Sequence, residues 1–359
     1  MKIVHILEDF SLKSGGIRTV VKDLHSKLID SGIESYIVTN DCETDDDVIK
    51  IDGDNRPWKY SKRLSGTLMN IHLKKSIDII HIHGVWMYPQ YKSAKYAIEN
   101  NISFIVSPHG MYEPWLWTKG TIKKKIYFKY LAKPAFSKAT YLHAITPDEA
   151  FELNRLFSKS KIAQIPNLID VQIEETEASP PKEKYILYLG RLDSKKGVDI
   201  LIKAFKNINS SGLKLYIAGA FNEYKIQLEA LADKLGVGGD IKFLGLITGE
   251  EKKNVYKNAY IFVAPSHSEV IGMVNLEAAI QKTPVITTHQ TGIHKDWSNN
   301  GGILINPRVE ELTDALKKSL CWTDAVREKN GERLQRFVIE NYSWKNRFKD
   351  WDNLYKSML

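Results

Sequence analysis

The chain of 359 residues has only two cysteines, Cys42 and Cys321, far apart in the sequence. Two such residues cannot build the disulfide framework of a small secreted protein. No apolar run approaches the roughly 18–20 residues that a membrane-spanning helix needs. The opening MKIVHILEDF turns acidic too early for an export signal. We therefore expect a protein of the reducing cytoplasm.

Motifs for dinucleotides and metal ions are also missing. No G-x-G-x-x-G follows a predicted strand, so a conventional dinucleotide site is poorly supported. The run Asp45–Asp47 is typical of a solvated loop and not of a D-x-D site for diphosphate-bound magnesium. The ten histidines include no H-x-x-x-H pair on a plausible helix. We therefore expect no bound metal, and expect cationic side chains and helix N–H groups to stabilise negative charge instead.

Length and patterning indicate two α/β domains. The hydrophobic content of 43% and charged content of 26% are ordinary for globular proteins. Strand-like runs alternate with helical patterns in both halves, at Lys2–Leu7, Glu34–Thr39, Asp78–His83, Ile102–Ser107, Tyr185–Leu189, Leu213–Ala218, Tyr260–Ala264 and Pro284–Thr287. This alternation predicts two Rossmann-like, doubly wound domains, residues 1–170 and 171–342, with a linker over 171–184. Aromatic residues at Trp344, Phe348, Trp351 and Tyr355 predict one buried face on a helix over 343–359.

The segment 265–292, PSHSEVIGMVNLEAAIQKTPVITTHQTG, has the most informative pattern. Glu269 and Glu277 stand eight residues apart, and apolar spacing predicts that a helix begins near Gly272. A helix N-terminus offers free N–H groups and a positive dipole end, which suit a phosphate. One carboxylate would then bind one sugar and the other a second sugar, with a diphosphate between them. The pattern indicates a nucleotide-sugar site.

A second motif, Gly190-Arg191 with Lys196-Gly197, follows a predicted strand and precedes a helix. A guanidinium and an ammonium at a strand end suit the oxygens of a diphosphate and the charge that develops when it departs. The alternative is a turn with two exposed cations, which is common in any protein. The nearby glutamate pair favours the phosphate interpretation.

Glycines and histidines mark the first half. Gly15-Gly16 is either a close approach to a ligand or a plain tight turn. His109, in Pro108-His109-Gly110 at a strand end, is predicted to reach the reacting sugar or the acceptor. His81 and His83 are expected on opposite faces of their strand, with His81 a structural residue and His83 undecided.

The net charge of +8 is uneven, because residues 112–138 contain seven lysines and one acidic residue, interleaved with aromatic and aliphatic residues. This composition is typical of a helix on an anionic membrane surface, or of one that reaches a phosphorylated acceptor. The alternative is a solvated basic helix whose aromatic residues pack into the core. We expect peripheral contact with the inner face of a membrane as one possibility, and no nucleic-acid partner.

Together these motifs resemble the retaining glycosyltransferases of family 4, which have the GT-B fold of two Rossmann-like domains facing across a cleft. The E-x7-E element matches Glu269 and Glu277, and the phosphate-binding element matches Gly190-Arg191 and Lys196-Gly197. Ser107–Gly110, followed by MYEPW, looks like the subgroup that builds polysaccharides and O-antigens. The usual E-x-F-G element reads Glu269-Val270-Ile271-Gly272 in this chain, so the aliphatic Ile271 stands where an aromatic residue is expected.

The resemblance implies transfer of a sugar from a UDP- or GDP-linked donor to a carbohydrate or lipid-linked acceptor. It implies that Glu269 binds the donor sugar, Glu277 the ribose, and Arg191 and Lys196 the diphosphate. We predict catalytic roles for His109, Arg191, Lys196 and Glu269, and donor binding by Gly15, Gly16, Gly190, Arg191, Lys196, Ile271, Gly272, Met273 and Glu277. It also implies that the C-terminal helix crosses back onto the first domain. The alternatives are a GT-B-like epimerase or phosphorylase, and a basic module that binds nucleic acid or membrane.

Overall fold

The computed structural model describes residues 1–11, 14–42, 48–51, 57–74, 76–117, 121–171, 183–208 and 212–359. The chain forms two compact units, Met1–Asn167 with Phe348–Leu359, and Leu168–Arg347. The first unit therefore includes the end of the chain. Most of the predicted linker over 171–184, and the acidic loop Asp45–Asp47, lie outside the described residues.

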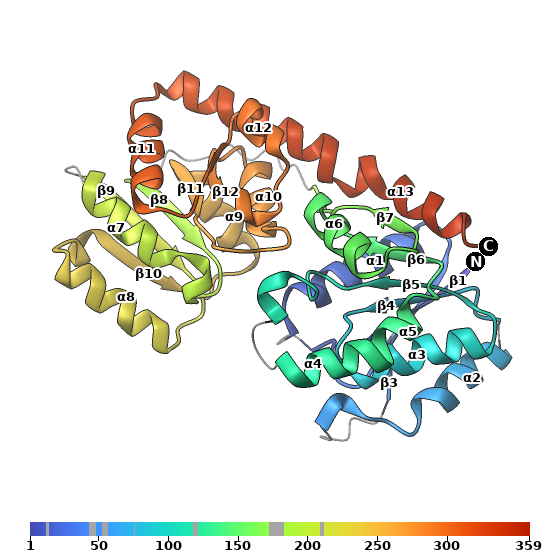
Figure 1. Ribbon diagram of the computed structural model, residues 1–359. Coiled ribbons are helices and arrows are strands. Elements are labelled where there is room, and N and C mark those ends of the chain that lie inside the picture. The colour runs from blue at the N-terminus through green and yellow to red at the C-terminus, as the bar shows by residue number, and fades with distance from the viewer. Residues whose placement is uncertain are drawn as a thin grey trace. The chain divides into compact units, whose positions relative to one another are not determined.

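The first unit contains a seven-stranded parallel sheet in the order β3-β2-β1-β4-β5-β6-β7 (Figure 1). The strands are β1 (Lys2–Leu7), β2 (Glu34–Thr39), β3 (Val48–Lys50), β4 (Ile79–His83), β5 (Ser103–Ser107), β6 (Tyr141–Ala144) and β7 (Ile162–Gln164). Its helices are α1 (Gly16–Asp30), α2 (Leu64–Lys74), α3 (Tyr88–Glu99), α4 (Thr121–Tyr127), α5 (Lys133–Phe136), α6 (Pro147–Leu156) and, in part, α13 (Trp344–Lys356). Short helical turns occupy Pro57–Lys59, Pro114–Trp117 and Phe128–Ala132.

The second unit repeats this topology with a six-stranded parallel sheet in the order β10-β9-β8-β11-β12-β13. The strands are β8 (Lys184–Leu189), β9 (Leu213–Ala218), β10 (Ile241–Gly245), β11 (Ile261–Ala264), β12 (Val285–Thr288) and β13 (Ile303–Ile305). The helices are α7 (Val198–Ile208), α8 (Glu223–Lys234), α9 (Gly249–Asn258), α10 (Met273–Ile280), α11 (Val309–Leu320) and α12 (Asp324–Tyr342). Short 3-10 turns occupy Ser194–Lys196, Gly238–Asp240, His289–Thr291 and Lys295–Asn300.

Both sheets are covered on both faces by helices, which confirms the prediction of two doubly wound domains (Figure 1). Coverage on both faces explains why the central strands are mostly apolar, as in the fully buried β11. In each sheet the strand order reverses between two central strands, β1 and β4 in the first unit and β8 and β11 in the second. Ligands of doubly wound sheets bind beyond the carboxyl ends of the strands at such a switch point.

The C-terminal helix α13 buries an aromatic face, as its spacing predicts. Trp344 and Trp351 are buried, and Tyr355 is fully buried. Within the first unit, the Tyr355 hydroxyl hydrogen-bonds Nδ1 of His81 at 2.7 Å, and Ser103 donates to the Met358 carbonyl at 2.9 Å. These contacts join the end of the chain to β4 and β5. Among the described helices, none is both long and apolar enough to cross a membrane.

Candidate functional site

In the second unit, the loop after β8 carries the basic motif to the switch point. Gly190 and Arg191 follow the strand directly, a 3-10 turn spans Ser194–Lys196, and α7 begins at Val198. Gly197 has φ 67°, and a Cβ there would lie 2.2 Å from the carbonyl oxygen of Pro265 in the loop after β11. Only glycine therefore fits where these two loops meet.

Lys196 and Glu269 are brought together as an ion pair at this junction. The Lys196 ammonium lies 2.9 Å from Oε2 of Glu269, with the two side chains only 17% and 14% exposed. Ser266 donates to Oε1 of the same carboxylate at 2.6 Å, and the Glu269 N–H donates to the Gln290 carbonyl at 2.8 Å. The carboxylate is thus held in place, and the ammonium is positioned without a ligand.

Arg191 differs from Lys196 in its surroundings. Its side chain is exposed and has no hydrogen-bond partner among the described residues, while its carbonyl accepts from the Tyr188 hydroxyl at 2.8 Å. An exposed guanidinium at the end of β8 can hydrogen-bond an anion that binds there.

Helix α10 begins at Met273, one residue after Gly272, as the spacing predicts. The Gly272 N–H donates to the Thr291 carbonyl at 3.0 Å, and Ile271 is buried. One turn on, Asn275 is fully buried, and neither polar atom of its amide has a partner in the described part of the chain. An unpaired buried amide is costly, so Asn275 is a polar group at the start of α10 whose hydrogen-bonding capacity is unsatisfied. Sequence reasoning missed Asn275, because an asparagine inside an apolar helix pattern carries no motif of its own.

Glu277 lies inside α10 and is held by two donors from α9. Its Oε2 accepts from the Tyr256 hydroxyl at 2.9 Å and pairs with the Lys252 ammonium at 2.7 Å. Burial, and then the nearby Glu277 charge, raise the pKa of Tyr256 well above its ordinary value. Oε1 of Glu277 has no partner among the described residues, so one carboxylate oxygen is oriented yet available. Tyr256 and Lys252 were not predicted, because they are distant in sequence from the motif.

In the first unit, His109 follows β5 at the carboxyl edge of the sheet. It is half-buried with φ 52°, a left-handed conformation that is uncommon for histidine. Glu149 holds the next residue, because its carboxylate accepts from the Gly110 N–H at 2.6 Å and from the Ile145 N–H at 2.8 Å. Burial raises the pKa of Glu149 to about 7. Strained backbone of this kind persists where the surroundings impose it, often at functional sites. Glu149 was not predicted.

Glu8 and Gln90 complete this edge. Glu8 follows β1 and accepts a hydrogen bond from Gln90, which also donates to the His83 carbonyl at 2.9 Å. Burial raises the pKa of Glu8. A Cβ on Gly84, which has φ 81°, would lie 3.2 Å from the Gln90 amide nitrogen and 3.4 Å from Oε2 of Glu8. Polar side chains therefore also lie at the switch point of the first unit, beyond the carboxyl ends of β1 and β4.

The predicted glycine pair lies at the start of α1. Gly15 is the N-cap residue with φ 76°, and Gly16 is the first helical residue. A Cβ at either position would have nothing within 4 Å. Backbone conformation therefore requires glycine at position 15, whereas only open space adjoins position 16.

The prediction that His81 and His83 face opposite ways is wrong. Residues two apart on a strand share a face, and the two ring centroids lie 4.0 Å apart. His81 is structural, as predicted, because it is fully buried and hydrogen-bonds Tyr355 and Ser107, each at 2.7 Å. His83 instead bonds to His109, which gives it a link to the predicted site.

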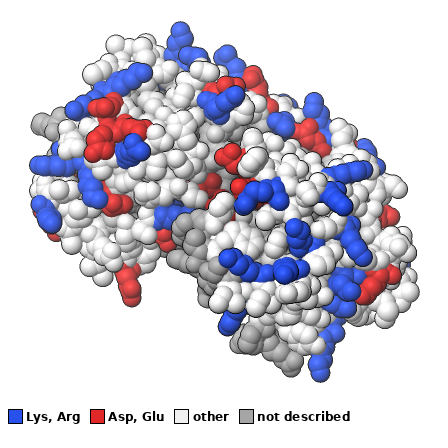
Figure 2. All heavy atoms as spheres, viewed as in Figure 1, with Lys and Arg blue, Asp and Glu red and all other residues white. Residues whose placement is uncertain are grey.

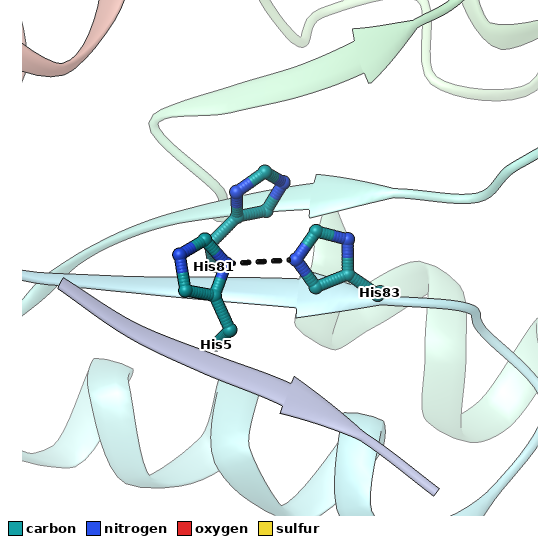
Figure 3. Close-up of side chains that lie close together, drawn as sticks. All are labelled: His5, His81 and His83. Carbon is teal, nitrogen blue, oxygen red and sulfur yellow. Dashed lines mark hydrogen bonds between the residues drawn. The ribbon is translucent and has the colours of Figure 1, made fainter. Parts of the chain in front are cut away.

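His5, His81 and His83 lie close enough to be considered as metal ligands (Figure 3). The geometry does not favour a shared ion. His5 and His83 hydrogen-bond each other at 3.0 Å, and both nitrogens of His81 are already bonded to other residues. The His81 and His83 rings approach each other in a tilted contact, with an interplanar angle of 34°. These histidines are better described as a hydrogen-bonded cluster.

Comparison with known proteins covers most of the chain. Residues 171–335 match the family described as Glycosyl transferases group 1, and residues 14–173 match Glycosyltransferase Family 4. An uncharacterized glycosyltransferase of Methanocaldococcus jannaschii is 35% identical over 183 residues, covering 48% of this chain and 45% of that protein.

One more distant relative and one solved structure are also similar to the chain. The O-antigen chain mannosyltransferase of Salmonella typhimurium is 26% identical over 235 residues, covering 64% of this chain and 62% of that protein. The structure of Anabaena HepE in complex with UDP and glucose superposes with a TM-score of 0.77 at 15% identity, covering 99% of this chain and 100% of that one. The chain thus spans about half to three fifths of the length of the Methanocaldococcus and Salmonella relatives. The likeness of fold to the HepE structure extends over nearly the whole chain.

Proposed function

Because the chain belongs to the glycosyltransferases of family 4 and has their GT-B type of fold, we propose that it transfers a sugar from a nucleoside diphosphate sugar. The acceptor in this proposal is a carbohydrate or a lipid-linked saccharide, in the synthesis of a surface polysaccharide or glycolipid. The observation that carries the proposal is the ion pair between Lys196 and Glu269 at the β8/β11 switch point, in the loops that lead to α7 and to α10, the helix that contains Glu277.

The geometry supports a division of labour within this site. The available oxygen of Glu277 suits a ribose hydroxyl, because its other oxygen is already held by Tyr256 and Lys252. The exposed Arg191 and the positioned Lys196 suit the diphosphate. Glu269, with Ser266 fixing one of its oxygens, suits the hydroxyls of the donor sugar.

In the proposed reaction the bond between the anomeric carbon and the diphosphate oxygen breaks, and the acceptor oxygen bonds to that carbon on the same face. The acceptor proton passes to the departing phosphate, so no protein nucleophile is assigned. Arg191 and Lys196 stabilise the charge that develops on the leaving group, and they do so without a metal ion. UDP and GDP are the proposed leaving groups.

A thermal-shift screen with UDP, GDP and ADP tests the donor site, because a ligand that binds the folded state raises its apparent stability. Turnover is then measured with the matching nucleotide-sugar, with and without a chelator. We expect Lys196→Ala to abolish most activity, whereas Lys203→Ala, which removes an exposed pair with Asp199, serves as the matched control. Activity lost to chelator and restored by magnesium would contradict the metal-independent mechanism. Conversion of the nucleotide-sugar without any acceptor would favour an epimerase.

A second proposal concerns the helical run 121–136, and a specific observation favours it. Tyr127 and Phe128 pack against the core, which matches the alternative of a basic helix with aromatic residues inside. Ile122, Ile126 and Tyr130, at successive intervals of four, are instead 76%, 55% and 64% exposed. Exposed lysines flank them at positions 123, 125, 129 and 133. Figure 2 shows basic side chains gathered over the part of the first unit that carries α4.

An apolar stripe with basic flanks suits the boundary of an anionic bilayer. We expect the protein to sediment with vesicles that contain anionic lipid and not with neutral ones. Ile122→Ser with Ile126→Ser removes the apolar contribution, and charge reversal at Lys123, Lys125 and Lys129 removes the electrostatic one. Unchanged sedimentation of both variants would contradict membrane binding by this run and support the alternative of a solvated basic helix. Salt-dependent binding to oligonucleotides in place of vesicles would favour a nucleic-acid partner.

A further inference from the structure

A chain of three histidines leads from the interior of the first unit to the predicted site. His5 of β1 bonds through Nδ1 to Nε2 of His83 at 3.0 Å, and His83 bonds through Nδ1 to Nε2 of His109 at 3.0 Å. Figure 3 shows the first of these contacts, between β1 and β4. His5 and His83 are almost fully buried, whereas His109 is half-buried.

The two ends of the chain differ. Nε2 of His5 is buried and has no hydrogen-bond partner among the described residues. At the outer end, Nδ1 of His109 is neither bonded to another described residue nor among the buried unpaired atoms. The inner end is therefore sealed, and the outer end is open to solvent or to a ligand.

Neutral imidazole has one N–H and one lone pair, so both hydrogen bonds of the chain must run in the same direction. If they run inward, His109 donates to His83, His83 donates to His5, and His5 is left with a buried Nε2–H that has no acceptor. If they run outward, the inner end holds only an unpaired lone pair, and His109 carries its proton on Nδ1. Buried N–H groups without partners are rarer than under-satisfied acceptors, so the outward direction is favoured.

We propose that His5 and His83 are positioning residues that place the ring proton of His109 on Nδ1, so that His109 meets its ligand as a hydrogen-bond donor and not as a general base. The oxygen that receives this hydrogen bond belongs to the sugar, the diphosphate or the acceptor, and this identity rests on the function proposed above. The tautomer itself does not depend on that function.

Two further observations agree with this assignment. Burial lowers the pKa of His5 and of His109 to about 3 and that of His83 well below its ordinary value, so all three rings are neutral at physiological pH. The left-handed backbone of His109, and the hydrogen bond from the Gly110 N–H to Glu149, fix the backbone that carries the ring independently of the ring's own hydrogen bonds. A ring held on both sides has a defined donor direction.

The tautomer is measured directly in the full-length wild-type protein labelled with ¹⁵N-histidine, by long-range ¹H–¹⁵N correlation. His109→Gln identifies the resonances of His109. We expect a protonated Nδ1 and an unprotonated Nε2 for His109, and the same for His83 and His5. A protonated Nε2 on His109 overturns the proposal. If the protein has no transferase activity but His109 shows the Nδ1–H form, the proposed function fails and this inference stands.

Variants of His83 separate positioning from simple packing. The amide of His83→Asn can replace Nδ1 and still donate to His109, whereas His83→Phe cannot. We expect His83→Phe to lose the Nδ1–H preference of His109 and to lower kcat, by at most about 10²-fold, which is the effect of losing one donor to a developing charge altogether. His83→Asn should restore most of both. The matched control is His143→Gln. His143 is also buried and bonds to Ser107 and the Ile165 carbonyl, and its replacement should leave the His109 tautomer unchanged. Equal kcat in the Asn and Phe variants, with the tautomer unchanged in both, would show that His83 only fills space.

Discussion

Replacing Glu277 with glutamine separates its ligand-binding role from its structural one. The amide oxygen of Glu277→Gln can still accept from the Tyr256 hydroxyl, which is 2.9 Å from Oε2 in the wild type. The ion pair with Lys252 is lost, but that ammonium is 29% exposed and can be solvated, so the cost falls in the range of about 0–1 kcal/mol for surface pairs. The fold should therefore be nearly as stable as the wild type.

The effect on ligand binding should be larger. Hydrogen bonds to a charged group contribute about 1.5–3 kcal/mol each, and about 1.4 kcal/mol corresponds to a tenfold change in Kd. Loss of one charge-assisted bond to the ribose therefore predicts nucleoside diphosphate binding that is weaker by roughly 10- to 150-fold. Calorimetric titration of UDP or GDP into both proteins measures this ratio, and chemical unfolding measures the stability change.

Ribose-deoxy nucleotides make the test specific. If Glu277 binds a ribose hydroxyl, removing that hydroxyl should weaken binding to the wild type but add little penalty in Glu277→Gln, because the interaction is already lost. Glu250→Gln is the matched control, since the exposed carboxylate of Glu250 also lies on α9 and forms an ion pair with Lys253 at 2.7 Å. Wild-type affinity in Glu277→Gln, or equal deoxy penalties in both proteins, would refute the ribose assignment.

Three further predictions concern stability. Gly197→Ala should lower the free energy of unfolding by about 2–4 kcal/mol and abolish donor binding, because φ is 67° and the new Cβ would lie 2.2 Å from the Pro265 carbonyl oxygen; wild-type stability in urea would contradict the close contact. Tyr355→Phe should cost about 1–3 kcal/mol in the same assay, since it leaves Nδ1 of the buried His81 without its partner, whereas Tyr130→Phe, at an exposed position, should have no effect. Acid should destabilise the protein, because burial lowers the pKa of His5 and His109 to about 3 and of His143 to about 4, so the unfolded chain binds more protons below pH 6.5. The free energy of unfolding should then fall by up to about 1.4 kcal/mol per pH unit for each such histidine as the pH drops from 6.5 towards 4. Glu149 partly opposes this trend, because its pKa is raised to about 7 and its contribution is complete only below pH 4.5; a stability that stays flat between pH 6.5 and 4.5 would refute the buried neutral cluster.

The alternation of apolar runs with amphipathic patterns predicted both sheets, because a strand covered on both faces is mostly apolar whatever packs against it. The start of α10 at Met273 followed from local spacing in the same way. The glycine at position 197 was recognised as part of a motif, but its reason, the close approach of the Pro265 carbonyl, needed the fold.

Local sequence thus determined the two doubly wound domains, the helix start between Glu269 and Glu277, and the basic motif after β8, since each depends on residues within a few turns of one another. Only the tertiary structure decided which residues hydrogen-bond or form ion pairs with the side chains of the predicted site. Lys252 and Tyr256 approach Glu277 from another helix, and Glu149 reaches Gly110 across 39 positions of sequence. His5 meets His83 because β1 and β4 are neighbours in the sheet, although 78 positions separate them in the chain. Hydrogen bonds of this kind depend on which strands pair and how they align, and no local pattern of residues specifies that.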